Sequence, residues 1–281
     1  MANPIDDNGT HHRKETYADQ ILAIARLETN LYDDFSTDYE KDEVTGAIQV
    51  PTRNGEVTVS EYDILAGITL TQSATTYLPL AIDKNYGINE LIDGYEANAV
   101  PDNIAAQRIE SAGVSIGLEK EAFAITALKT GTVGTNLTKS TVETIYKNIA
   151  TDISNMKKRG MKVNMMRVAV SADSELALLT DAKFANTSAQ LGAELIREGV
   201  IGKINGVFVK PNYLMDDDIE YVIYDRRFCQ KYEVWKVEPS IQEIKDGKHI
   251  GASALQGRMV GGLAVTNALG VQLKKFTEAS I

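Results

Sequence analysis

Residues 167–184 read RVAVSADSELALLTDAKF, and residues 198–214 read EGVIGKINGVFVKPNYL. The first stretch continues an apolar run over 165–170 that is typical of a buried strand. Polar residues at 171–174 interrupt this strand and are expected to cap a short helix over 175–180. The second stretch predicts a turn or short helix, then a glycine break and a strand. Together the two stretches predict a mixed α/β unit.

This unit extends in both directions, to about residues 137–230, after a loop at 130–136. On its N-terminal side, Ser140 is expected to cap a helix that runs through about Arg159. Apolar residues at helical spacing form one face of that helix: Val142, Ile145, Ile149 and Ile153. The small and polar residues at 181–193 predict a surface loop. Further strands are expected in a strand-rich C-terminal third, at 221–224, 232–238 and within 258–276.

A cluster of basic residues surrounds the expected end of this helix at Gly160. Its members are Lys157, Lys158, Arg159, Lys162 and Arg167. The helix dipole favours basic groups at a helix C-terminus, and glycine commonly terminates helices. Helix capping is therefore the favoured interpretation, and a phosphate-binding patch is the alternative.

The longest helical candidate runs from Asp102 to about Thr130. Pro101 suits the first turn of such a helix, and Asp102 favours its N-terminal end. Its apolar residues recur at steps of three, four and seven: Ala105, Ile109, Ala112, Ile116 and Phe123. Gly113 and Gly117 weaken the helix locally but let another element approach closely. At about 1.5 Å per residue the helix would be roughly 40 Å long, well beyond the average helix of a globular protein.

An extended ribbon is predicted N-terminal to the long helix. A first strand over 47–52 is expected to close at Pro51, followed by a turn at 53–55. Alternating residues over 56–65 and an apolar run at 77–83 predict further strands. A long two-stranded ribbon is marginal by itself in water, so something else must cover it, most simply a neighbouring subunit.

The N-terminal 45 residues hold eleven acidic and only four basic groups, most of the chain's net charge of −10. Within them, residues 1–16 are polar and 17–31 predict a helix. An acidic surface repels phosphates, so sequence-reading DNA or RNA binding is disfavoured. The single cysteine excludes an internal disulfide, and the sequence offers neither a transmembrane stretch nor a signal segment. We therefore expect synthesis in a cytoplasm and no membrane contact.

Residues suited to catalysis or metal binding are scarce. His11 and His12 lie in a polar arm without metal-type spacing, and His249 lies in a predicted exposed turn. Cys229 follows a strand and is interpreted as a half-buried structural thiol. No Gly-x-Ser-x-Gly motif is present, which disfavours a serine hydrolase.

Two other stretches resemble binding motifs only superficially. In 199–203, Gly-Lys is followed by Ile204 rather than by the Ser or Thr of a phosphate loop. The acidic run 216–220 lacks the spacing and central glycine of an EF-hand loop, which favours a solvated turn. The sequons at Asn8, Asn136 and Asn186 are interpreted as chance matches. We thus predict no catalytic, cofactor or metal site.

The order of these elements resembles the tailed-bacteriophage major capsid protein family, which has the Hong Kong 97-type capsid fold. The resemblance covers about residues 17–275, and the two stretches at 167–184 and 198–214 carry most of it. The flanks of that family's extended loop are similar to 46–51 and 77–84, and its spine helix is similar to 101–130. The fold class implied is α+β.

The resemblance also implies a domain organisation. It implies an N-terminal arm at 1–45, an extended β-hairpin loop at 46–86 and an axial domain at 137–235. The peripheral domain would combine 87–136, with a spine helix at about 102–130, and 236–281.

The function implied is structural, not enzymatic: self-assembly into an icosahedral shell that encloses a phage double-stranded DNA genome. The implied partners are other copies of the chain in pentamers and hexamers, a portal protein and, in some cases, a decoration or cement protein. A separate scaffolding protein is expected, because the helix at 17–31 begins too early for a cleaved scaffolding domain. DNA would touch the lumen non-specifically, and the shell would assemble in the bacterial host cytoplasm as part of the virion. The alternatives are an encapsulin-type nanocompartment shell and an unrecognised α/β enzyme.

Overall fold

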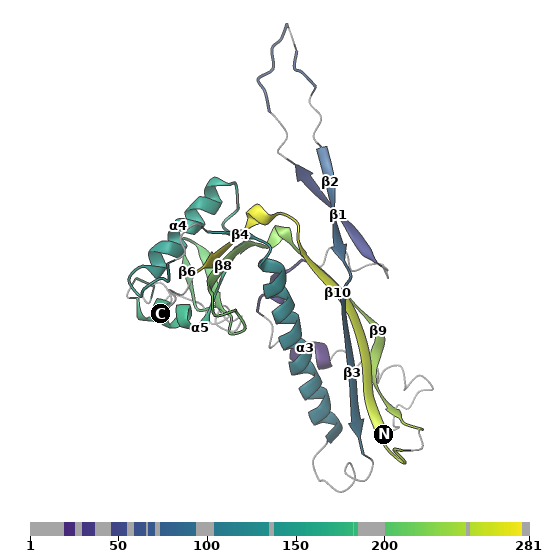
Figure 1. Ribbon diagram of the computed structural model, residues 1–281. Coiled ribbons are helices and arrows are strands. Elements are labelled where there is room, and N and C mark those ends of the chain that lie inside the picture. Colours follow the sequence, from purple (N-terminus) through teal and green to yellow (C-terminus); the bar gives the residue numbers. More distant parts are fainter. Residues whose placement is uncertain are drawn as a thin grey trace, which may run out of the picture.

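The computed structural model describes eleven segments of the chain: 20–25, 30–36, 46–54, 59–65, 67–70, 74–93, 104–134, 138–181, 183–184, 200–245 and 248–276. They form an α+β structure with three separate sheets. One lobe is built on the largest sheet, a long helix lies along a second sheet, and a two-stranded ribbon projects beyond both (Figure 1). Among the described helices, none has both the length and the apolar composition needed to cross a bilayer.

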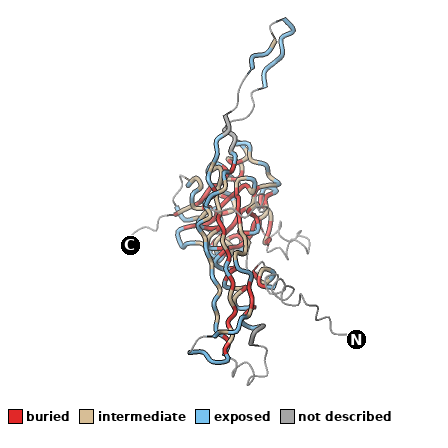
Figure 2. The backbone as a smooth tube through the Cα atoms, turned by 90° about the vertical axis from the view of Figure 1, so that its right-hand side faces the viewer, coloured by how far each residue is buried: buried red, intermediate tan, exposed pale blue. Residues whose placement is uncertain are grey.

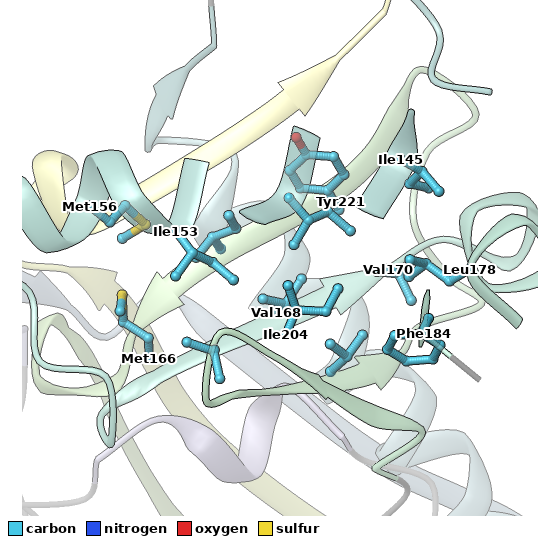
Figure 3. Packing of buried hydrophobic residues seen from close by; sticks show 14 residues of the cluster. Ile145, Ile153, Met156, Met166, Val168, Val170, Leu178, Phe184, Ile204 and Tyr221 are labelled. Carbon is cyan, nitrogen blue, oxygen red and sulfur yellow. The ribbon is translucent and has the colours of Figure 1, made fainter. Parts of the chain in front are cut away.

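The largest sheet has the strand order β4-β11-β8-β5-β7-β6. Its strands are β4 (Thr132–Val133), β11 (Val271–Lys275), β8 (Ile219–Asp225), β5 (Met166–Val170), β7 (Val207–Pro211) and β6 (Gly202–Ile204). Helix α4 (Ile145–Lys158) packs on one face of this sheet, and α5 (Ala172–Thr180) follows β5. Ile153 and Met156 of α4 meet Met166 and Val168 of β5 in a core that excludes water (Figure 3).

The strand–helix pattern at 165–180 is confirmed by β5 and α5. The expected cap at Ser140 is wrong, because α4 begins at Ile145. Ser140 instead donates its hydroxyl to Glu220 of β8 at 2.7 Å, and its backbone N–H to the same carboxylate.

Two other expectations in this lobe need correction. The single strand expected before Pro211 is two strands, β6 and β7, joined at Asn205 and Gly206. Both of these residues have positive φ, as a two-residue hairpin turn requires. The surface loop expected at 181–193 is wrong at Phe184, whose side chain is fully buried in the core.

The second sheet has the order β3-β10-β9, with β3 (Lys84–Ile92), β10 (Ser253–Val265) and β9 (Cys229–Glu243). The long helix is confirmed as α3 (Ile104–Leu128), and it packs on this sheet through Ile109 and Ile116. The close approach expected at Gly113 is also confirmed, because a Cβ there would lie 2.8 Å from the side chain of Ile24.

The ribbon consists of β1 (Ala47–Asn54) and β2 (Ala74–Ala81), paired antiparallel from Ala47↔Ala81 to Asn54↔Ala74. The expected end of the first strand at Pro51 is wrong. Proline is tolerated there because β1 is an edge strand, whose outer side needs no donor. The strand expected over 56–65 does not form within 59–65, where an isolated bridge joins Asp63 to Gly67.

The N-terminal helix is described only over residues 20–25, which are helical as expected. Asn30 and Leu31 are not helical, and the rest of 17–31 lies outside the described residues. Strand β11 from the C-terminal part and strand β4 pair within the largest sheet. That sheet therefore takes strands from both sides of the boundaries expected at 136/137 and 235/236.

Candidate assembly surfaces

The base of the ribbon is held on the second sheet by a small apolar cluster. Val50 of β1 and Leu80 of β2 pack against Tyr232 of β9, and all three are buried. The fit is close at Gly262 of β10, where a Cβ would collide with the carbonyl oxygen of Ala81. Glycine thus lets the backbone of the ribbon lie directly on β10, which fixes the direction in which the ribbon leaves the molecule.

The far end of the ribbon carries large apolar side chains with nothing packed on them. Their exposed fractions are 92% for Val59, 89% for Ile64, 99% for Leu65 and 97% for Leu70. Figure 2 shows this end exposed and well separated from the body of the protein. A local turn shapes it, since Leu65 donates its backbone N–H to the Asp63 carboxylate at 2.7 Å. We call residues 59–70 the ribbon tip.

A second surface lies beside α3, where β3 and one face of the helix line a groove of about 550 Å³. Arg108 and Glu90 form an ion pair of 3.0 Å across it. The helix wall offers small side chains, Ser111, Ala112 and Ser115. The groove also contains Glu119, and the ribbon tip carries Glu61 and Asp63, so charge does not favour a tip from another copy in this groove.

Buried charges join the arm residues 30–36 to the rest of the molecule. Glu121 of α3 is 3% exposed, and its carboxylate accepts the backbone N–H groups of Asn30, Leu31 and Tyr32 at 2.9–3.1 Å. The side-chain amide of Asn212 donates to the same carboxylate. Burial raises the pKa of Glu121, and these hydrogen bonds offset the rise only in part.

A second carboxylate, Glu233 of β9, lies on the other side of Tyr32. It accepts the Tyr32 hydroxyl at 2.6 Å and pairs with Lys120 of α3 at 2.8 Å. Burial alone would raise the pKa of Glu233, but Lys120, Tyr32 and Lys231 together lower it below its usual value. Lys120 and Lys231 also lie over the Tyr32 ring, 5.2 and 4.3 Å from its centre.

Asp34 makes the third of these links. It accepts the Tyr224 hydroxyl of β8 at 2.7 Å and lies 3.4 Å from Lys210 and 3.3 Å from Arg226. Burial raises the pKa of Tyr224 well above its usual value. The hydroxyl therefore stays protonated and donates a hydrogen bond to Asp34. Glu121, Glu233 and Asp34 thus tie residues 30–34 to α3, β9 and the largest sheet at once.

The structure separates the residues that were considered for chemistry. Cys229 is fully buried rather than half-buried, and burial raises the pKa of its thiol, so it is not a reactive thiolate. His249 lies exposed in the segment that joins β9 to β10. His11, His12, Asn8, Asn136, Asn186 and Gly199 lie outside the described residues.

The acidic run 216–220 does not converge on a cation site. Asp216 pairs with Lys129 at 2.5 Å, Asp218 pairs with Lys275 at 3.3 Å, and Glu220 accepts from Ser140. Across the described part of the chain, no group of three or more His, Cys, Asp or Glu side chains is placed to hold a metal ion.

Sequence reasoning missed the buried charges that anchor the arm. One signal for them existed, because Lys120 falls four residues after Ile116 and four before Ala124, on the apolar face of the long helix. A charged residue in a buried helix stripe needs a partner of opposite charge, but the sequence does not say that this partner is Glu233.

No protein-family model and no curated protein sequence matches the chain. Solved structures do match it. A structure from Mycobacterium phage Che8 is 18% identical, with a TM-score of 0.67 over 87% of this chain and 90% of that one. The mature capsid of bacteriophage PhiM1 is 15% identical, with a TM-score of 0.65 over 90% and 88%. A virus-like particle from Pyrococcus furiosus is 11% identical, with a TM-score of 0.59 over 93% and 98%. These similarities confirm the expected Hong Kong 97-type capsid fold.

Proposed function

We propose that this chain, which has the fold of phage capsid subunits, is the structural subunit of an icosahedral shell around a phage double-stranded DNA genome. The main observation in support of this proposal is the ribbon tip. Its apolar side chains are almost fully exposed on a projection that the rest of the chain does not cover. Burying one such side chain is worth about 1.5–3 kcal/mol, so contact with other copies would stabilise the protein considerably.

The domain assignment follows from the same proposal. Residues 137–235, with β4 and β11 completing their sheet, form the axial domain around five-fold and six-fold axes. The rest of 87–136 and 236–281 forms the peripheral domain around α3. The loop at 46–86 lies across a neighbouring copy, and the arm at 1–45 reaches over another. Such contacts are heterologous and repeat around closed rings of five or six copies.

Other partners follow from the requirements of a genome container. We propose a portal protein, a separate scaffolding protein and, where present, a decoration or cement protein. Packaged DNA contacts the lumen without reading sequence. The shell assembles in the bacterial host cytoplasm and becomes part of the virion, and the role is structural rather than enzymatic.

A shell with another cargo is the second candidate, because the virus-like particle from Pyrococcus furiosus has the same fold. Two of the phage structures superpose with higher TM-scores than this particle, 0.67 and 0.65 against 0.59, which favours the genome container. An α/β enzyme has less support, because the described residues that could do chemistry lie apart or are buried.

The test is negative-stain electron microscopy with light scattering on the purified full-length chain, with and without a co-expressed scaffolding protein. Closed shells, tubes or isolated pentamers and hexamers support the proposal. A chain that stays monomeric under all conditions, including crowding and high salt, would overturn it.

Variants of the ribbon tip make this test specific. Leu65→Asp places a charge where the proposal requires apolar contact, so we expect the yield of assembled particles to fall at least tenfold. Leu65→Met keeps the apolar character and should assemble normally. Both variants should fold, because Leu65 is 99% exposed within one chain. Equal assembly of the two variants would show that the tip is not a contact.

A further inference from the structure

Six basic side chains gather at one end of the largest sheet. They come from the end of α4, the loop after it and the adjoining strands: Lys157, Lys158, Arg159, Lys162, Arg167 and Lys203. We call them the basic end. Lys157 donates to the carbonyl oxygen of Asn205 at 3.0 Å, and this contact joins the end of α4 to the β6–β7 turn. Arg167 donates to the carbonyl oxygen of Asn164 at 3.1 Å within the same region.

None of these six cations pairs with a carboxylate of the described residues, although the chain has a net charge of −10. Several basic residues elsewhere do pair with carboxylates, as Lys129 does with Asp216 and Lys275 with Asp218. Even at the same edge of the sheet, Arg227 pairs with Asp225 at 2.6 Å. Within the described residues, therefore, no carboxylate neutralises the basic end.

The helix dipole does not explain this cluster. It favours cations in the last turn of α4, where Lys157 and Lys158 lie, and Gly160 with φ +86° terminates the helix as expected. Lys162, Arg167 and Lys203 lie beyond that turn. A helix end carries only about half a negative charge, far less than six cations.

Two of the cations are held in place by an aromatic ring. Arg167, Phe208 and Lys203 are cross-strand neighbours on β5, β7 and β6. The Arg167 guanidinium lies 4.9 Å and the Lys203 ammonium 4.4 Å from the centre of the Phe208 ring. The alternation of the strands places this row on the sheet face opposite α4. The ring orients both charges without neutralising them.

We propose that the basic end binds the phosphate groups of double-stranded DNA without reading its sequence. The inference rests on the proposed function, which supplies DNA as the polyanion inside the shell. Several cations without a carboxylate partner among the described residues attract phosphate groups, and contacts to phosphate carry no sequence information. Because the chain as a whole is acidic, we expect DNA to be attracted to this surface more than to the rest of the chain.

The test measures the affinity of the full-length chain, kept unassembled as shown by light scattering, for a fluorescent 20-base-pair DNA. Four phosphate contacts would give a slope of log affinity against log salt of about −3.6. The double variant Lys158→Gln/Lys162→Gln should reduce the size of that slope by about 1.8, equally for unrelated DNA sequences. Lys129→Gln/Lys275→Gln removes the same charge from paired positions and should leave the slope unchanged.

Other results would overturn the inference. These are equal slopes for the two double variants, no salt-dependent binding, or poly-glutamate binding as tightly as DNA, which would point to an acidic protein segment. Electron microscopy of the same variants, under conditions that permit assembly, separates this inference from the proposed function. If shells form but the chain does not bind DNA, only the DNA-binding inference is refuted. If the chain binds DNA but no shells form, only the capsid proposal is refuted.

Discussion

Leu31 donates its backbone N–H to both carboxylate oxygens of Glu121, at 2.9 and 3.1 Å. The two residues are 90 positions apart, and both are buried. The contact is therefore a tertiary link between residues 30–32 and α3. Because Asn30 and Tyr32 donate to the same carboxylate, the loss of one side chain would release three consecutive backbone groups.

Glu121→Gln should weaken this link, because an amide offers one acceptor oxygen where the carboxylate offers two. We expect the free energy of unfolding to fall by about 1–3 kcal/mol, the cost of buried donors left unsatisfied. Hydrogen exchange at residues 30–32 should become faster. Glu119→Gln, on the exposed side of the same helix, is the control and should change stability by less than about 0.5 kcal/mol. Unchanged exchange at 30–32 would contradict the role given to Glu121.

We predict that the contribution of Glu233 to the free energy of unfolding is lost in acid. Its folded-state pKa is lowered, so its contribution is present above the usual glutamate pKa of about 4.3 and is lost as the pH falls through the folded-state value. The difference in unfolding free energy between the native chain and Glu233→Gln should therefore shrink from pH 7 to pH 3. Denaturant titrations at each pH measure it. The exposed Glu238→Gln should give a difference that does not depend on pH, and the same behaviour from Glu233→Gln would refute the prediction.

Gly262→Ala should displace the ribbon, because its Cβ would collide with the Ala81 carbonyl oxygen. We expect a cost of about 1–3 kcal/mol, typical of overpacking, and faster hydrogen exchange in β1 and β2. Gly87→Ala in β3 is the matched control, since the nearest atom to its Cβ lies 4.0 Å away. If the two variants behave alike, the close contact at Gly262 does not position the ribbon.

Phe184→Ala should leave a cavity in the core beneath α4. The side chain is fully buried, so the expected cost is about 3–5 kcal/mol, measured by thermal or denaturant unfolding. Leu176→Ala removes a side chain that is 67% exposed on α5 and should cost far less. A small effect at Phe184 would mean that the segment around it is a surface loop after all.

Periodic and local patterns were enough to predict much of the fold. The 25 residues of α3 and the strand–helix unit of β5 and α5 have regular apolar spacing, and both form close to where they were expected. The ribbon was expected from short apolar and alternating stretches with a turn signal between them. Its first strand passes through Pro51 because an edge position removes the usual penalty, and the sequence alone does not reveal an edge.

Contacts between residues far apart in the chain could not be predicted from the sequence. Nothing in residues 30–36 indicates that Glu121, Glu233 and Lys210 surround them, because those partners come from three distant elements. The basic residues at 157–167 were visible in the sequence. Their relation to Lys203, and the lack of a carboxylate partner among the described residues, show only in the folded chain.

The place of β11 in the largest sheet has a consequence for timing during synthesis. This strand lies between β4 and β8, so residues 132–133, 219–225 and 271–275 must meet before the sheet is complete. A nascent chain on the ribosome therefore cannot finish this lobe until residue 275 has emerged, and pairings so distant in sequence form slowly. Incomplete chains therefore lack the finished lobe.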